Sequence, residues 1–111
     1  MTAVRLTKPW TALTAGAVAD LRGELGVYQL ADADGEVLRI GYAGGRSLFG
    51  LRGELAAVLA SGEAASFRVE VTAQYLSRYE ELLMVHKADF GRLPHGNAAD
   101  AGRRLGRLSP G

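Results

Sequence analysis

The fold is decided by Gly26-Val27-Tyr28-Gln29-Leu30-Ala31 and, after a short turn, by Val37-Leu38-Arg39-Ile40-Gly41-Tyr42-Ala43. In the first segment Val27 and Gln29 alternate with Tyr28 and Leu30, and alternation with a period of two indicates a strand. Asp34-Gly35 lies between the segments and is a favoured hairpin turn. The sequence therefore predicts a hairpin, and we expect Tyr28 and Tyr42, near facing strand ends, to share one pocket.

The residues after the hairpin predict a helix and then a third strand. Apolar residues recur at spacings of three and four from Leu48 to Leu59, which predicts a helix over about residues 48–60. Ser47 is its expected N-cap, and Ser61-Gly62 ends it. Apolar and polar residues alternate from Phe67 to Thr72, as in a half-buried strand.

A last helix is predicted from a capping signal. Ser77-Arg78-Tyr79-Glu80 matches the capping box, so the helix is expected to start there and to end at Gly91. The residues from Leu93 to Asn97 are expected to form a loop. Before the hairpin, Thr11 or Thr14 is expected to cap a short helix that ends near Leu21.

These elements define an α+β fold. We expect one domain over residues 1–97, with a small, three-stranded, mainly antiparallel sheet flanked by helices. Residues 98–111 are rich in alanine, glycine and arginine and offer little to bury, so we expect a flexible tail or a short marginal helix.

Composition narrows the classes of function. The 111 residues carry a net charge of only +1, whereas nonspecific nucleic-acid binders usually show a clear basic excess. There is no cysteine, which excludes disulfides and zinc-thiolate sites and is compatible with the cytoplasm, where we expect the protein to be. No apolar run is long enough for a membrane span, and the first residues do not form a secretory signal.

Gly26-Val27-Tyr28, Tyr42-Ala43-Gly44 and Arg52 stand in an order that resembles the GIY-YIG nuclease family. The resemblance covers roughly residues 9–97. It implies that Tyr28 assists removal of a proton from water, that Tyr42 orients the site, and that Arg52 neutralises the scissile phosphate. It also implies a glutamate on a later helix that holds one divalent metal ion.

That glutamate is Glu80 or Glu81, and we assign Glu81 because Met84 and Val85 follow it at the family's spacing while the capping box occupies Glu80. A carboxylate suits Mg²⁺ or Mn²⁺, which can stabilise charge on the leaving oxygen. Gly44 and Arg46 are expected to bind substrate at a glycine-rich turn. Asn97, which resembles the asparagine that often closes this module, is a third expected substrate contact.

The leading hypothesis is therefore a metal-dependent endonuclease that hydrolyses phosphodiester bonds in DNA, with branched or damaged DNA as the candidate substrates. Targeting is expected to come from a protein partner or from homo-oligomerisation. The alternative is a catalytically weak or inactive module that binds nucleic acid or a protein through the same groove. Near-neutral charge favours this alternative.

Overall fold

A computed structural model describes residues 5–100 and shows an α+β fold built on one antiparallel sheet. Its strands are β1 (Thr11–Ala12), β2 (Gly26–Ala31), β3 (Val37–Ala43) and β4 (Ser66–Val71). They lie in the order β1-β4-β2-β3, and every neighbouring pair is antiparallel. The predicted hairpin of β2 and β3 is confirmed. The prediction of three strands is wrong, because the short β1 pairs with β4 and adds a fourth.

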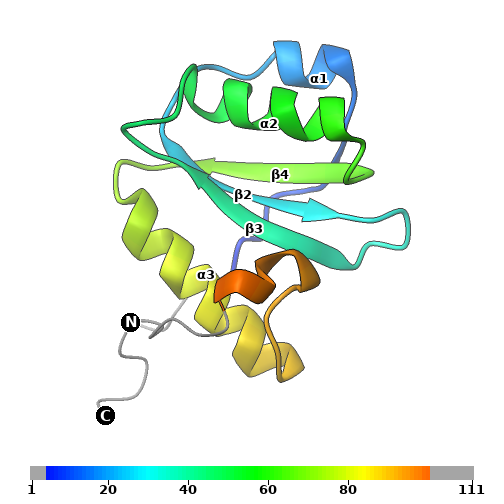
Figure 1. Cartoon of the computed structure of the whole chain (residues 1–111), viewed down its shortest axis with the longest axis vertical. Helices are drawn as coiled ribbons and strands as arrows, with labels where there is room; N and C mark the ends of the chain where they lie inside the picture. Colours follow the sequence, from blue (N-terminus) through cyan, green and yellow to red (C-terminus); the bar gives the residue numbers. More distant parts are fainter. Residues whose placement is uncertain (1–4, 101–111) are drawn as a thin grey trace.

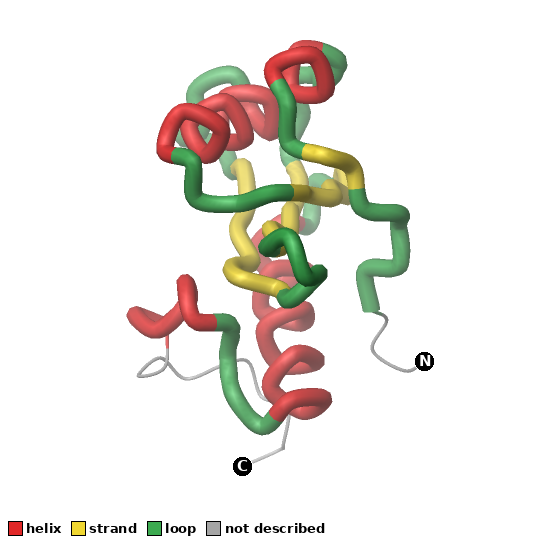
Figure 2. The backbone as a smooth tube through the Cα atoms, turned by 90° about the vertical axis from the view of Figure 1, so that its right-hand side faces the viewer, coloured by secondary structure: helices red, strands yellow, loops and turns green. Residues whose placement is uncertain are grey.

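Helices cover both faces of the sheet. Helices α1 (Ala15–Ala19) and α2 (Gly50–Ser61) lie on one face, and α3 (Tyr75–Phe90) lies on the other, as Figures 1 and 2 show. The 3₁₀-helix η1 (His95–Asp100) lies beside β3 on the side of α3. No helix within residues 5–100 is both long enough and apolar enough to cross a membrane.

Each face of the sheet has its own apolar core. Tyr28, Leu30 and Phe67 pack under α1 and α2, against buried residues that include Leu51 and Leu55. On the other face Val27 and Ile40 pack against α3. The two-residue period of the strands produces this division, since neighbouring side chains point to opposite faces.

Several predicted helix ends are confirmed and others are wrong. Thr14 caps α1 through a hydrogen bond from the Ala17 amide, and Gly91 ends α3 in a left-handed conformation. Ser47 does not cap α2, because Phe49 is the N-cap and the Ser47 hydroxyl instead accepts a bond from the Gly44 amide. The capping box is also wrong, because α3 begins at Tyr75 and Ser77 lies inside it.

The end of the described chain also differs from the prediction. The segment expected to be a loop enters η1 at His95, and this helix continues to Asp100. The expected tail therefore begins with helical residues. Residues 101–111, where the rest of the tail was predicted, lie outside the described part of the chain.

Candidate functional site

A polar cluster surrounds the Tyr28 hydroxyl on the α2 side of the sheet. The hydroxyl accepts a hydrogen bond from Arg39 Nη1 at 3.1 Å and lies 3.4 Å from Glu54 Oε1, to which it donates. Arg39 also forms a two-point ion pair with Glu63, at 2.7 and 3.2 Å. Glu54 and Arg39 thus hold the phenol directly, and Glu63 holds Arg39.

The cluster forms because Gly41 faces Tyr28 across the hairpin. Gly41 pairs with Tyr28, and a Cβ atom at Gly41 would lie only 2.3 Å from Cζ of the tyrosine ring. The absence of a side chain lets the ring lie over β3, where its hydroxyl reaches Arg39. Burial is the main cause that raises the pKa of Tyr28 above the ordinary value for tyrosine. A phenol held in its neutral form is a poor proton acceptor.

Tyr42 lies on the opposite face of the sheet, so the expectation that the two tyrosines share a pocket is wrong. Its cross-strand partner is Val27, which belongs to the core under α3, and its ring stacks on Tyr75 and meets Tyr79 edge-on. The cause is a one-residue register shift near Leu30 and Ala31. Such a bulge inverts which residues of the strand face each side.

Arg52 does not join Tyr28 either. Residues two apart on an α-helix point about 200° apart, so Arg52 leaves the flank opposite that of Glu54, which contacts Tyr28. The Arg52 side chain is exposed, and among residues 5–100 it makes no hydrogen bond or ion pair. The predicted convergence of Tyr28 with Arg52 is therefore wrong.

The start of α2 is not an open anion site. Amide groups of a first helical turn attract anions only while they lack partners. Here the amides of Leu51 and Arg52 donate to the carbonyl oxygens of Glu24 and Arg22, and the Gly45 amide donates to the Tyr75 hydroxyl. These amide groups at the glycine-rich turn and at the start of α2 therefore already have partners inside the protein.

Glu81, the predicted metal ligand, is held by an arginine. Arg78 pairs with Glu81 one turn away on α3 and also with Glu70 on β4. These ion pairs raise the pKa of Arg78 above its ordinary value, with Glu70 as the main cause. Within residues 5–100 no group of three or more histidine, cysteine, aspartate or glutamate side chains is placed to hold a metal ion.

Asn97 is buried rather than available to substrate. Its Oδ1 accepts a hydrogen bond from the Ile40 amide at 2.8 Å, and its Nδ2 donates to the Ile40 carbonyl at 2.9 Å. The side chain therefore pairs with the outer edge of β3 as a further strand does. Only 3% of the residue is exposed, so the side chain serves β3 here, and its role in substrate binding stays a prediction.

Three of the predicted residues do lie together. Tyr42, Gly44 and Arg46 line an open pocket of about 680 Å³ between the end of β3 and the start of α3. We call it the corner pocket; its other lining residues are Gly45, Ser47, Leu48, Glu54, Tyr75 and Leu76. Glu54 connects it to the Tyr28 hydroxyl, so the corner pocket and the Tyr28 cluster meet at one carboxylate.

The sequence reasoning missed the partners of Tyr28. Arg39, Glu54 and Glu63 are not among the site residues that the sequence predicted. Arg39 lies two residues from Gly41, the cross-strand neighbour of Tyr28. Residues two apart on a strand point to the same face of the sheet, so this spacing indicates that Arg39 and Tyr28 share a face. Glu54 and Glu63 lie on and just after α2, and only the packing of that helix brings them to the strand.

Tyr28→Phe should lower the free energy of unfolding by about 1 kcal/mol, because a phenylalanine ring keeps the packing but loses two partly buried hydrogen bonds. Tyr42→Phe is the matched control, since the Tyr42 hydroxyl has no partner among the described residues. Urea unfolding of both variants measures the difference. Equal stability of the two variants would contradict the hydrogen-bonded role of Tyr28.

Comparison with known proteins finds one family. The sequence model of a domain of unknown function, DUF7508, matches residues 4–89, which include all four strands and nearly all of α3. No curated protein and no solved structure matches the chain.

Proposed function

The chain belongs to the DUF7508 family, and we propose that it is a GIY-YIG-like module that binds a protein partner at the corner pocket. The order of β2, β3, α2, β4 and α3 supports the GIY-YIG likeness, since that family also runs strand, strand, helix, strand, helix. Neither Tyr28 nor Arg52 lines the corner pocket with Tyr42. This supports binding over catalysis, because a hydrolytic centre needs its groups around one phosphate.

The observation that carries the proposal is a group of exposed apolar side chains at the corner pocket. Leu48 is 75% exposed and Leu76 is 49% exposed, and both line the pocket beside Tyr42. Phe49, the next residue after Leu48, is 66% exposed. Large apolar side chains gathered on a surface mark interaction sites, whereas single ones do not.

The backbone holds this group in a strained conformation. Phe49 has φ 64° and ψ 18°, in the left-handed region that a bulky residue rarely adopts. The conformation costs on the order of 1 kcal/mol, and the bonds from Leu51 and Arg52 to the loop of residues 22–24 maintain it. A strained corner that displays a phenylalanine to solvent favours a binding role over a purely structural one.

The chemistry of the surroundings favours a protein over a nucleic acid. Arg46 and Glu54 bring opposite charges to the corner pocket, and the whole chain carries only +1. Phosphate binding depends on an excess of positive charge, whereas protein interfaces combine aromatic and apolar anchors with a mixed polar rim. The expected partner presents an apolar side chain to the space between Leu48 and Leu76.

The test is site-specific photo-crosslinking with a benzophenone amino acid at position 48, compared with the same probe at Asp34 in the exposed hairpin turn. A protein captured only at position 48 is then purified, and its affinity is measured for the wild type, Phe49→Asn and Phe90→Asn. Phe90 is a matched control, because it is equally exposed at the far end of α3.

The proposal expects Phe49→Asn to weaken binding by at least about tenfold, as for a lost interface anchor, and Phe90→Asn to leave it unchanged. Equal capture at positions 48 and 34, or equal affinity of the wild type and Phe49→Asn, would overturn it.

The same variant also makes a prediction about folding. Phe49→Asn should leave the free energy of unfolding unchanged or raise it by up to about 1 kcal/mol, since asparagine tolerates the left-handed conformation better than phenylalanine. Urea unfolding measures this change. A large loss of stability would show that the phenylalanine ring stabilises the fold. Weaker partner binding by Phe49→Asn would then reflect unfolding rather than the loss of an interface contact.

Metal-dependent cleavage of DNA is the competing function, and Tyr42, Gly44 and Arg46 in one pocket are the observation in its favour. Purified protein with Mg²⁺ or Mn²⁺ is tested on plasmid, single-stranded, flap, junction and RNA substrates. We expect no cleavage. Metal-dependent cleavage that Tyr28→Phe or Arg52→Ala abolishes would replace the binding proposal with the nuclease.

A further inference from the structure

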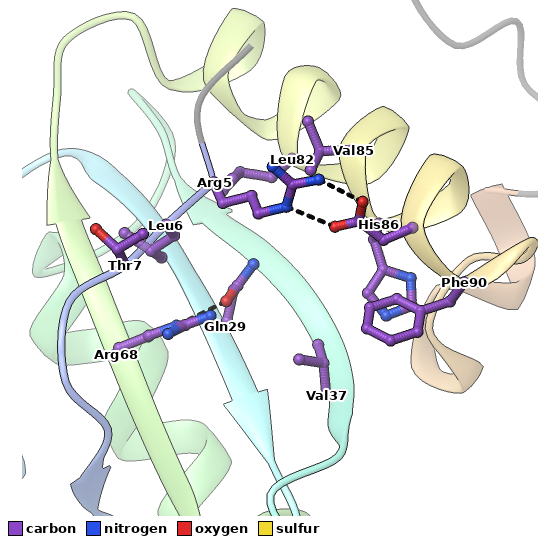
Figure 3. Close-up of a pocket in the computed structure, with 11 residues that line it drawn as sticks. Arg5, Leu6, Thr7, Gln29, Val37, Arg68, Leu82, Val85, His86 and Phe90 are labelled. Carbon is purple, nitrogen blue, oxygen red and sulfur yellow. Dashed lines mark hydrogen bonds and ion pairs between the residues drawn. The ribbon is translucent and has the colours of Figure 1, made fainter.

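A second cavity, of about 440 Å³, lies between the sheet and the C-terminal half of α3, as Figure 3 shows. We call it the α3 cavity. The N-terminal segment contributes Leu6, the sheet contributes Gln29 and Arg68, and α3 contributes Leu82 and Val85. Its volume falls in the range of small-molecule sites, and its walls combine apolar side chains with a few polar groups, as such sites do. The corner pocket lies at the other end of α3.

Gln29 offers the cavity a hydrogen-bond donor without a partner. The residue is only 6% exposed, and its Oε1 accepts a bond from Arg68 Nε at 2.8 Å. Because an arginine can only donate, this bond fixes the amide oxygen on the side of Arg68 and the amide nitrogen on the other side. Figure 3 shows that nitrogen turned toward the open space under α3.

The Gln29 nitrogen is open to the cavity rather than sealed in the core. Within residues 5–100 the Gln29 side-chain nitrogen makes no hydrogen bond. In the same residues every side-chain nitrogen or oxygen that is fully buried has a hydrogen-bond partner, so this nitrogen is not fully buried. The nitrogen therefore retains access from the cavity. This accessible donor can bond to an acceptor that lies outside the described residues.

Arg68 beside it is a cation without an anion. Its guanidinium donates to Gln29 and to the Lys8 carbonyl and lies 4.1 Å from the centre of the Trp10 ring. No carboxylate of the described residues pairs with it. Burial lowers the pKa of Arg68 below its ordinary value, which is the effect of desolvating an unpaired charge. An anionic ligand would relieve that cost.

Asp89, the acidic residue of the α3 cavity, does not pair with Arg68. Asp89 also lines the α3 cavity, but Arg5 holds it through two hydrogen bonds, the Nε bond at 2.7 Å. His86, on the same turn of α3, has its Nδ1 2.9 Å from the Arg92 carbonyl. Arg68 therefore leaves the cavity with one unbalanced positive charge, next to a free amide donor and an apolar wall.

We propose that the α3 cavity binds a small organic carboxylate with an aliphatic body, whose carboxylate accepts a hydrogen bond from the Gln29 nitrogen and whose chain packs on Leu82 and Val85. The positive charge of Arg68, on the other side of the Gln29 amide, attracts the carboxylate. This site is independent of the corner pocket, and failure of either proposal leaves the other standing.

The test follows the Gln29 side-chain amide directly by two-dimensional ¹⁵N NMR of the full chain. Its two signals are assigned by their absence in Gln29→Met. The protein is then titrated with hexanoate and, separately, with 1-hexanol, which matches the chain length but lacks the carboxylate. Hexanoate should shift the Gln29 signals in a saturable way, and hexanol should bind at least about tenfold more weakly, as expected without a charge-assisted hydrogen bond.

Variants locate the charge that is responsible. Arg68→Met should weaken hexanoate binding by about tenfold or more, while Arg22→Met, an exposed arginine near α1, should bind as the wild type does. Should Arg68→Met fail to fold, the comparison of hexanoate with hexanol on the wild type decides alone. No saturable shift of the Gln29 signals up to the solubility limit, or equal binding of acid and alcohol, would overturn the proposal.

Discussion

Asn97→Ala should lower the free energy of unfolding by about 3 kcal/mol. The substitution removes three buried hydrogen bonds, one of them to the Tyr79 hydroxyl, and leaves the amide and the carbonyl of Ile40 without partners on the outer edge of β3. Each buried group without a partner costs about 1–3 kcal/mol. Urea unfolding of the wild type and the variant measures the loss.

Two further variants separate the hydrogen bonds from the rest of η1. Asn97→Asp keeps an oxygen for the Ile40 amide but loses the donor to the Ile40 carbonyl, so it should also be strongly destabilised. His95→Ala removes an exposed side chain from the same short helix and should change stability by less than about 0.5 kcal/mol. Similar losses for Asn97→Ala and His95→Ala would contradict the role of the Asn97 amide.

The hairpin could be predicted because its signal is local. The alternation in β2 and the Asp34-Gly35 turn specify two paired strands, and both strands have the predicted bounds. The faces of the tyrosines could not be predicted, since they depend on one residue of register. Ala31 pairs with Val37, whereas Leu30 pairs with Arg39, so Leu38 is the extra residue. No local pattern in the sequence reveals this shift, and it moves Tyr42 away from Tyr28.

The predicted N-caps of α2 and α3 were wrong for a related reason. Ser47 and Ser77 both carry the side chain that a helix start prefers, but Ser47 bonds to the Gly44 amide and Ser77 lies inside α3. The first amides of α2 find carbonyl oxygens in the loop of residues 22–24, which is distant in sequence. A local capping signal cannot account for a partner that folding brings from another segment. The amides of the glycine-rich turn likewise find partners that the local pattern does not reveal, since Gly45 donates to the Tyr75 hydroxyl.

The second large loss of stability is expected at Gly50, where α2 packs against the loop of residues 22–24. Its φ is +57°, and a Cβ atom there would lie 2.4 Å from the backbone carbon of Gly23 and 2.6 Å from the Glu24 oxygen. Both atoms belong to backbone and cannot turn aside as a side chain can. Gly50→Ala should therefore cost at least about 3 kcal/mol, through left-handed strain together with overpacking.

Gly62→Ala is the matched control for Gly50→Ala. Gly62 ends the same helix with φ +70°, but nothing lies within 4 Å of the added atom, so only the strain of about 1 kcal/mol remains. Urea unfolding should separate the two variants by about 2 kcal/mol. Capture of the partner at the corner pocket should fall for Gly50→Ala alone, since that variant pushes Leu48 and Phe49 off the loop that holds them. Equal losses of stability for Gly50→Ala and Gly62→Ala would show that the loop of residues 22–24 does not support Leu48 and Phe49. The proposal that partner binding depends on a preorganised surface at the corner pocket would then be contradicted.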